Sequence, residues 1–128
     1  LPVRFAGFLN QSEITAAYAA GNALILPSDS GETWGLVVNE AMACGLPALV
    51  SDQVGSARNL VDNGVTGGVF ACGDVAGLAG LMRDCSRDVS ALHAMGSAAR
   101  ACVHSDYNFE RVVDGAMAAL GFVARKRP

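Results

Sequence analysis

The sequence predicts an α/β fold in which a Rossmann-like parallel sheet is flanked by helices. Segments typical of strands and of helices alternate along the first half of the chain, and mainly helical segments follow residue 74. Residues 23–27 form a continuous apolar run, which is typical of a parallel strand buried on both faces. The chain has 128 residues, of which 52% are hydrophobic and 16% charged, so it is long enough for one compact domain. We therefore expect a doubly wound sheet followed by C-terminal helices.

Capping and stop signals place the elements of the first half. Asn10 and Glu13 have the spacing of a capping box, so a helix should begin there, and Gly21 is a plausible end for it. Gly45 and Pro47 should stop the next helix. The expected elements are a strand at 3–8, a helix at 10–20, a strand at 23–27, a helix at 34–44 and a strand at 48–50.

Turn signals and amphipathic patterns place the second half. The pairs at residues 63–64 and 67–68 predict turns, and Asp74 is a suitable N-cap for a helix with one apolar stripe. The last helix is expected to close the fold. The expected elements are a helical turn at 57–61, a small strand at 69–70, helices after residue 74, at 90–103 and at 109–123, and a basic tail at 124–128.

Charge and cysteine content exclude several classes of function. Nine Lys and Arg against 12 Asp and Glu give a net charge of −3, which provides no basic field for nucleic acid or anionic lipid. No apolar run approaches the roughly 20 residues of a membrane helix, so membrane contact is not expected. The four cysteines form no Cys-x-x-Cys pair, and we expect no metal site. Free thiols suit a reducing compartment, which predicts a cytoplasmic protein.

Two glutamates mark the candidate binding site. Parallel sheets bind ligands at the carboxyl ends of their strands, and Glu32 lies in the loop after the 23–27 strand. Glu40 is the only charged residue between Glu32 and Asp52, in an otherwise apolar helix. A carboxylate leaving an apolar face needs hydrogen-bond donors, and the two vicinal hydroxyls of a ribose supply them. The alternative is that Glu40 belongs to a solvated stripe and binds no ligand.

Gly35 precedes the helix that carries Glu40. A glycine here lets a ligand approach, and the amides of residues 35–37 would point outward from the helix start, where phosphates bind readily. Close packing of the helix against a strand would also explain this glycine. No Lys or Arg occurs between Arg4 and Arg58, so a cation for a diphosphate must come from elsewhere. Gly-x-Gly-x-x-Gly and Walker motifs are absent.

The segment at 27–47, PSDSGETWGLVVNEAMACGLP, resembles retaining glycosyltransferase family 4. The resemblance rests on two glutamates separated by seven residues in their Gly-Leu-Val and Glu-Ala-Met-Ala contexts, and it extends over roughly residues 3–120. It implies a GT-B architecture of two facing Rossmann-like domains. Residues 1–123 would then be a partial C-terminal nucleotide-sugar-binding domain that lacks its first βα unit.

The resemblance also implies roles for individual residues. Glu40 would bind ribose hydroxyls, and Glu32, the catalytic residue, would contact the transferred sugar and stabilise charge rather than attack. The implied reaction is metal-independent, and its donor substrate is a nucleotide diphosphate sugar with no further cofactor. The remaining implied contacts are Trp34, Gly35, Leu36 and Val37 to the donor sugar and phosphate, and Phe8 and Leu9 to the base.

The family's remaining machinery is expected upstream of Leu1. The Arg and Lys that neutralise the diphosphate, and a whole N-terminal acceptor domain, belong there by resemblance, so we expect negligible transfer by this chain alone. Asn22 and the pair at 58–59 depart from the family pattern. What the resemblance implies for the turn that contains residues 58–59 therefore stays open. A binding-only nucleotide-sugar module and a GT-B-shaped nucleotide-sugar epimerase are the alternatives. The base, the sugar and the acceptor stay open.

Overall fold

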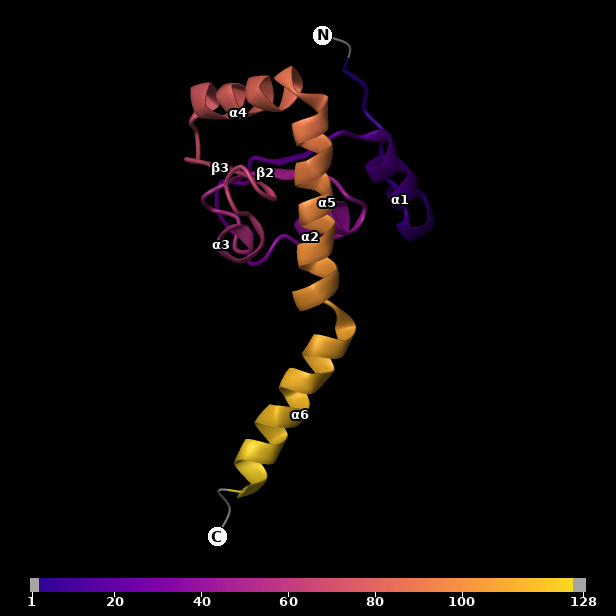
Figure 1. The fold of residues 1–128 in the computed structure, drawn as a ribbon, viewed down its shortest axis with the longest axis vertical. Coiled ribbons are helices and arrows are strands. Elements are labelled where there is room, and N and C mark those ends of the chain that lie inside the picture. Colours follow the sequence, from indigo (N-terminus) through magenta and orange to yellow (C-terminus); the bar gives the residue numbers. More distant parts are fainter. Residues whose placement is uncertain (1–2, 126–128) are drawn as a thin grey trace.

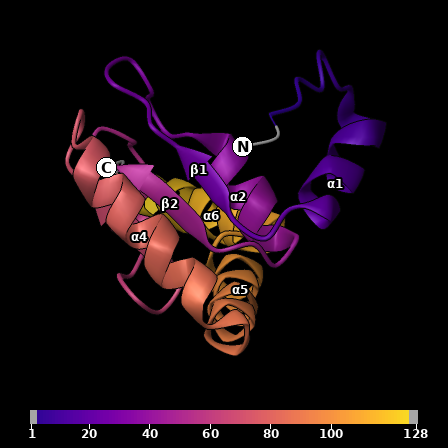
Figure 2. The same ribbon diagram turned by 90° about the horizontal axis from the view of Figure 1, so that it is seen from above.

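The structure, a computed structural model, describes residues 3–125 and contains a parallel sheet with helices on both faces (Figures 1 and 2). Its strands lie in the order β1-β2-β3, and both neighbouring pairs are parallel. The Rossmann-like α/β class expected from the sequence is therefore confirmed. The strands are β1 (Leu24–Leu26), β2 (Ala48–Ser51) and β3 (Gly67–Phe70).

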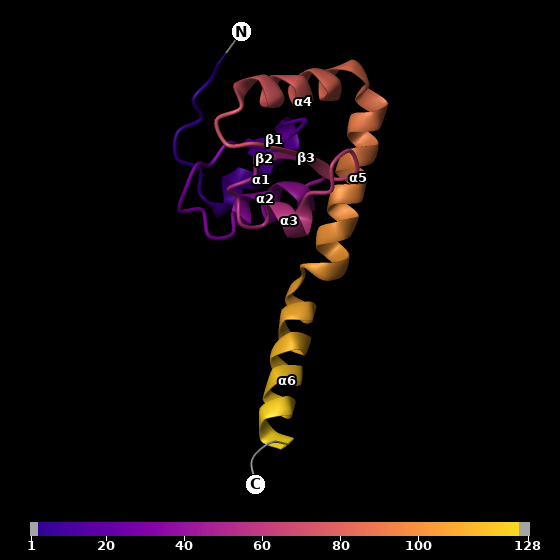
Figure 3. The ribbon, with the colours of Figure 1, turned by 90° about the vertical axis from the view of Figure 1, so that its left-hand side faces the viewer.

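Helices cover the two faces of this sheet in separate layers. In Figure 3, α4 lies on one side of the strands, α2 and α3 lie on the other, and α5 runs past one end of the layers. The α1 helix sits apart, beside α2 (Figure 2). The helices are α1 (Gln11–Ala20), α2 (Leu36–Ala43), α3 (Ala57–Leu60), α4 (Val75–Arg87), α5 (Val89–Asp106) and α6 (Phe109–Arg125).

The core lies between β2 and the helices α2, α3 and α5. All four residues of β2 are buried, as a central parallel strand requires. Met42 of α2, Leu60 of α3 and Val103 of α5 belong to one buried cluster with Val50 of β2. A second, smaller cluster of Tyr18, Ala41 and Leu46 joins α1 to α2. The position of α1 thus depends on few buried side chains.

The expected caps are present at the starts of α1 and α4. The Asn10 side chain accepts a hydrogen bond from the Ser12 amide at 2.9 Å, and the Glu13 carboxylate accepts one from the Asn10 amide at 3.1 Å. Asp74 accepts a hydrogen bond from the Gly77 amide at 2.8 Å. These contacts satisfy amides that a helix start leaves unpaired, which confirms both predicted helix starts.

Two local predictions are wrong. Residues 3–8 form no strand, and Phe5 and Phe8 are 96% and 94% exposed. A strand needs a neighbour for its backbone hydrogen bonds, and within residues 3–125 this segment pairs with none. Gly67 and Gly68 form part of β3 rather than a turn. A Cβ on Gly67 would lie 2.0 Å from the carbonyl oxygen of Ala48, so this glycine permits close pairing of β3 with β2.

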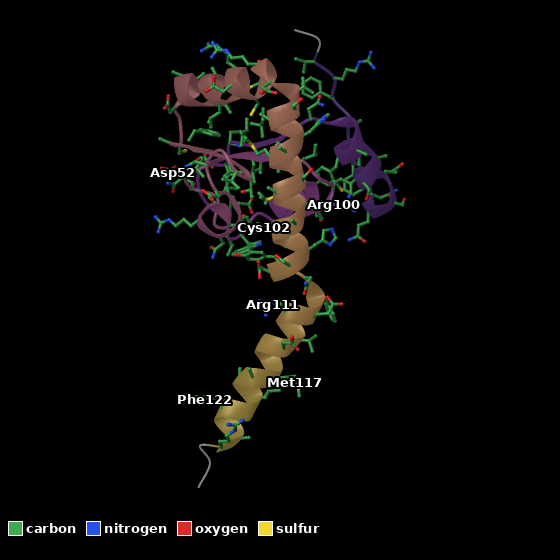
Figure 4. All side chains as sticks on the ribbon, in the orientation of Figure 1. Asp52, Arg100, Cys102, Arg111, Met117 and Phe122 are labelled. Atoms are coloured by element: carbon green, nitrogen blue, oxygen red, sulfur yellow. The ribbon has the colours of Figure 1, made fainter. Side chains whose placement is uncertain are left out.

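The expectation that the last helix closes the fold is also wrong. Figures 1 and 3 show α6 projecting away from the sheet, and it contains no buried residue. Met117 lies far along this helix in Figure 4, and its exposed fraction is 64%. An amphipathic pattern predicts a helix with an apolar face, but it does not say which surface that face covers. The helix includes Ala124 and Arg125, and residues 126–128 of the expected basic tail lie outside the described residues.

We expect removal of residues 109–128 to leave the free energy of unfolding within about 0.5 kcal/mol of the whole chain, because no described residue of α6 is buried. Urea unfolding followed by circular dichroism measures it. The Leu60→Ala variant is the control, since this side chain is 2% exposed and its truncation should cost about 2–5 kcal/mol. A loss in the shortened chain as large as the loss in Leu60→Ala would place α6 in the cooperative unit.

Candidate functional site

Two loops meet at the carboxyl ends of the first two strands. The β1–α2 loop, residues 27–35, contains Glu32, and the β2–α3 loop, residues 52–56, follows the adjacent strand. Ser51 at the end of β2 donates a hydrogen bond from its hydroxyl to the Ser28 carbonyl oxygen. Glu32 is half-buried in this arrangement. The structure thus places Glu32 at the sheet edge where ligands of parallel sheets bind.

Backbone contact holds the two loops together. A Cβ on Gly55 would lie 2.0 Å from the Thr33 carbonyl oxygen, so only glycine allows this approach. The Ser56 amide donates a hydrogen bond to the Trp34 carbonyl oxygen at 2.8 Å. The Ser56 hydroxyl is buried, and it has no hydrogen-bond partner among residues 3–125. The path of the chain around Glu32 is therefore set by main-chain contact with the β2–α3 loop.

Gly35 is the N-cap of α2 and adopts a left-handed conformation, with φ of 86° and ψ of 60°. A side chain here would be strained, and its Cβ would lie 3.1 Å from Cγ1 of Val54. Close packing therefore accounts for this glycine, which was one of its two predicted explanations. In the described part of the chain the amides of residues 35–37 donate no hydrogen bond, as is usual at a helix start. The other explanation, approach of a ligand at this glycine, stays a prediction.

Glu40 is exposed, as the alternative of a solvated stripe on α2 predicts, and its binding of a ligand stays a prediction. It lies on the side of α2 that faces α1, and α1 approaches without covering it. The Tyr18 hydroxyl donates a hydrogen bond to Oε2 of Glu40 at 2.9 Å. Between the two helices lies a cavity of about 320 Å³, the α1–α2 pocket, which is lined by Gln11, Ile14, Thr15, Tyr18, Glu40, Ala43 and Cys44.

Tyr18 is the functional candidate that the sequence did not identify. Its side chain is 8% exposed, and burial raises its pKa to about 12, with further contributions from the hydrogen bond and the negative charge of Glu40. A single tyrosine in an alanine-rich helix is indistinguishable from an ordinary core residue in the sequence. Only the packing of α1 on α2 reveals that its hydroxyl meets a carboxylate.

The side chain of Trp34 is occupied by structural contacts. Its indole Nε1 donates a hydrogen bond to Oδ1 of Asn39 at 2.8 Å, and its ring centroid lies 6.2 Å from that of Tyr107. The Tyr107 hydroxyl in turn donates to the Asn59 carbonyl oxygen at 3.0 Å. Trp34 therefore connects the start of α2 with the end of α5. Its ring is not among the residues that line the α1–α2 pocket.

Phe8 and Leu9 directly precede the cap of α1. Phe8 is almost fully exposed, whereas Leu9 is half-buried. Gln11 and Ile14, from the first turns of the same helix, line the α1–α2 pocket. Phe8 and Leu9, the two residues predicted to bind a base, therefore come just before the helix α1, which lines one side of the pocket that contains Glu40.

Asp52 joins the ends of β2 and β3. Its carboxylate accepts hydrogen bonds from the Cys72 amide at 3.0 Å and the Gln53 amide group at 3.2 Å. These bonds, the Cys72 contact first, hold the pKa of Asp52 below its usual value, and the charge of Arg58 acts in the same direction. Asp52 therefore stabilises the loop arrangement beside Glu32.

Within residues 3–125, no group of three or more His, Cys, Asp and Glu side chains is arranged to hold a metal ion. No helix in that range is long and apolar enough to cross a membrane. Glu32 and the amides at the start of α2 follow the carboxyl end of β1, whereas the Tyr18 hydroxyl meets Glu40 between α1 and α2.

Sequence comparison identifies relatives of the chain. A sequence profile described as "Glycosyl transferases group 1" matches residues 2–101. Glycogen synthase of Mycobacterium tuberculosis is 38% identical over 124 residues, covering 97% of this chain and 29% of that protein. A sulfoquinovosyl transferase of Arabidopsis thaliana is 38% identical over 103 residues, covering 78% of this chain and 20% of that protein. The chain thus spans less than a third of the length of these relatives.

Solved structures share the fold. Sucrose-phosphate synthase of Thermosynechococcus elongatus superposes with a TM-score of 0.82 at 28% identity, covering 94% of this chain and 30% of that chain. HepE of Anabaena, in complex with UDP-glucose, superposes with a TM-score of 0.68 at 28% identity, covering 84% of this chain and 29% of that chain. These similarities confirm the expected α/β domain class.

We predict that Gly55→Ala lowers the free energy of unfolding by about 1–3 kcal/mol, because the added methyl group overlaps the Thr33 carbonyl oxygen. Urea unfolding measures the change. Ser56→Ala is the matched control: it keeps the amide bond to Trp34 and removes a buried hydroxyl without a partner in the described residues, so stability should stay equal or rise. A Gly55→Ala variant as stable as the parent chain would contradict the contact between the loops.

The raised pKa of Tyr18 predicts a loss of stability at alkaline pH. The unfolded chain ionises this phenol near its ordinary value of 10, whereas the folded chain resists ionisation until about 12. Stabilisation is therefore complete below pH 10 and is lost as the pH rises toward 12. The free energy of unfolding, measured from pH 8 to 11, should fall more steeply in the parent chain than in Tyr18→Phe. Parallel curves for the two proteins would refute this assignment.

Proposed function

The chain belongs to the glycosyl transferase group 1 family, and from this membership we propose that it binds the nucleotide-sugar donor for a retaining glycosyl transfer. The transfer itself is proposed as an activity of a longer polypeptide, since the chain spans 29% of its glycogen synthase relative. Within that enzyme, residues 1–123 would act as part of the donor-binding domain of a GT-B, family 4 transferase. The acceptor stays unassigned.

The arrangement around Glu40 is the observation that carries the proposal. Its carboxylate lines a pocket, Oε2 is held by Tyr18, and Oε1 has no hydrogen-bond partner among the described residues. A carboxylate with open acceptor positions suits the two vicinal hydroxyls of a ribose. We assign the ribose to Glu40 and the base to the segment of Phe8 and Leu9, which precedes the wall of the same pocket.

The start of α2 is proposed to bind the phosphate and sugar. Its unpaired amides at Gly35, Leu36 and Val37 and the positive end of the helix dipole favour an anion. Glu32 lies in the loop that leads into this helix, where its carboxylate would stabilise positive charge on the sugar as the bond to the diphosphate breaks. Trp34 is assigned a positioning role instead of a donor contact, because its indole binds Asn39.

The solved structures with a similar fold support a particular class of donor. HepE of Anabaena, 28% identical to this chain, was solved with UDP and with UDP-glucose. We therefore propose a uridine diphosphate sugar as the first donor to test, ahead of guanosine and adenosine donors. We also propose the cytoplasm, where nucleotide sugars are available, as the compartment. The cations and the acceptor-site groups needed for transfer are assigned to other parts of the enzyme, so residues 1–128 alone should bind the donor without turning it over.

We predict that Glu40→Ala weakens nucleotide binding about 10- to 100-fold, because hydrogen bonds to a charged carboxylate contribute about 1.5–3 kcal/mol. Isothermal titration with UDP, GDP and ADP identifies the preferred nucleotide and measures the loss. Glu110→Ala is the control, because Glu110 is also an exposed glutamate but lies on α6, and it should bind like the parent chain. Unchanged binding of the preferred nucleotide by Glu40→Ala would remove the ribose assignment.

A further inference from the structure

Among residues 3–125, the Glu40 side chain has one hydrogen-bond partner, and that partner comes from a different helix. Tyr18 is anchored in the small buried cluster that joins α1 to α2, and its hydroxyl donates to Oε2 of Glu40 at 2.9 Å. Figure 2 shows α1 and α2 side by side. The tyrosine is 8% exposed, whereas the glutamate is exposed. A rigid, buried donor therefore holds one end of a side chain that would otherwise sample several rotamers in water.

We propose that Tyr18 is a positioning residue for ribose recognition, which holds Oε2 of Glu40 so that the carboxylate meets the ribose hydroxyls in a fixed orientation. The inference rests on the proposed binding of ribose by Glu40. It adds a specificity determinant on α1, outside the segment of the two glutamates. Tyr18 itself need not touch the ligand.

The chemistry of the pair suits this role. Burial and the adjacent negative charge keep the phenol protonated at neutral pH, so Tyr18 only donates to the carboxylate. An ionised carboxylate accepts about four hydrogen bonds, and Tyr18 uses one of these positions. The open positions on Oε1 and the remaining one on Oε2 accept from two hydroxyl donors. A nucleotide without these hydroxyls gains nothing from the fixed orientation, so the role of Tyr18 is specific to the ribose.

The second tyrosine offers a matched control. Tyr107, the C-cap of α5, also uses its hydroxyl as a donor, but to the carbonyl oxygen of Asn59 in α3. Tyr18→Phe and Tyr107→Phe therefore remove the same atom and one hydrogen bond each. Only the first of these bonds involves the candidate site. A difference in nucleotide binding between the two variants reports the orientation of Glu40 rather than a general effect of losing a hydroxyl.

The test is isothermal titration of the chain with UDP, GDP and ADP, and with the 2′,3′-dideoxy form of the nucleotide that binds best. Tyr18→Phe should weaken binding of the ribonucleotide about 3- to 10-fold, the range expected for one hydrogen bond, and leave the dideoxy form unchanged. Tyr107→Phe should change neither affinity. In a Glu40→Ala background, Tyr18→Phe should have no further effect, because a double-mutant cycle isolates their coupling.

The other outcomes either separate this inference from the proposed function or overturn both. If Glu40→Ala weakens ribonucleotide binding and Tyr18→Phe does not, the positioning role fails and the ribose assignment stands. Equal weakening of both nucleotide forms by Tyr18→Phe would show a packing role and overturn the inference. If no nucleotide binds, or if neither variant changes the affinity, both proposals fail.

A second measurement covers a Tyr18→Phe variant that does not fold. A buried, hydrogen-bonded phenol proton exchanges slowly with water and is visible by proton NMR. This signal should be present in the complex of the parent chain with its preferred nucleotide and absent in Glu40→Ala. Its absence from the parent complex would overturn the contact on which the positioning role depends.

Discussion

Main-chain contact between the two loops at the carboxyl edge of the sheet is the constraint on which the candidate site depends. Gly55 lets the β2–α3 loop touch the Thr33 carbonyl group, and the Ser56 amide binds the next carbonyl oxygen of the same loop. Together these contacts fix where α2 begins and therefore where its unpaired amides point. Glu32 is held in the same loop.

Helix α2 is then held from both sides by aromatic residues. Trp34 joins its start to Tyr107 at the end of α5, while Tyr18 of α1 reaches Glu40 near its middle. The two contacts differ in how firmly the buried core holds the helix that makes them. The α5 side belongs to the main core, whereas α1 is attached through a small cluster. Displacement of α1 would therefore alter the surroundings of Glu40 and leave the amides at the start of α2 in place.

Much of the fold and part of the site were predictable because their causes are local. The caps at Asn10 and Asp74 and the strand β1 depend on residues a few positions apart, and these predictions are confirmed. The expected burial of β1 on both faces is wrong, because Ile25 is 37% exposed. The predictions fail where the structure of a segment depends on residues far away in the sequence. A strand at 3–8 requires a pairing neighbour, and the place of α6 depends on a surface for its apolar face. Periodicity reports that an element has an apolar face and carries no information about its partner.

The sequence by itself determined the alternation of strands and helices, the spacing of the two glutamates and the glycine that starts α2, because each follows from residues adjacent along the chain. Only the tertiary structure decided that Glu40 is exposed beside α1, that Tyr18 holds it, and that the Trp34 ring is committed to packing. These features join segments that meet only when helices pack. Burial and hydrogen-bond partners are properties of that packing, so the identity of Glu40's partner could not be deduced from its neighbours in the chain.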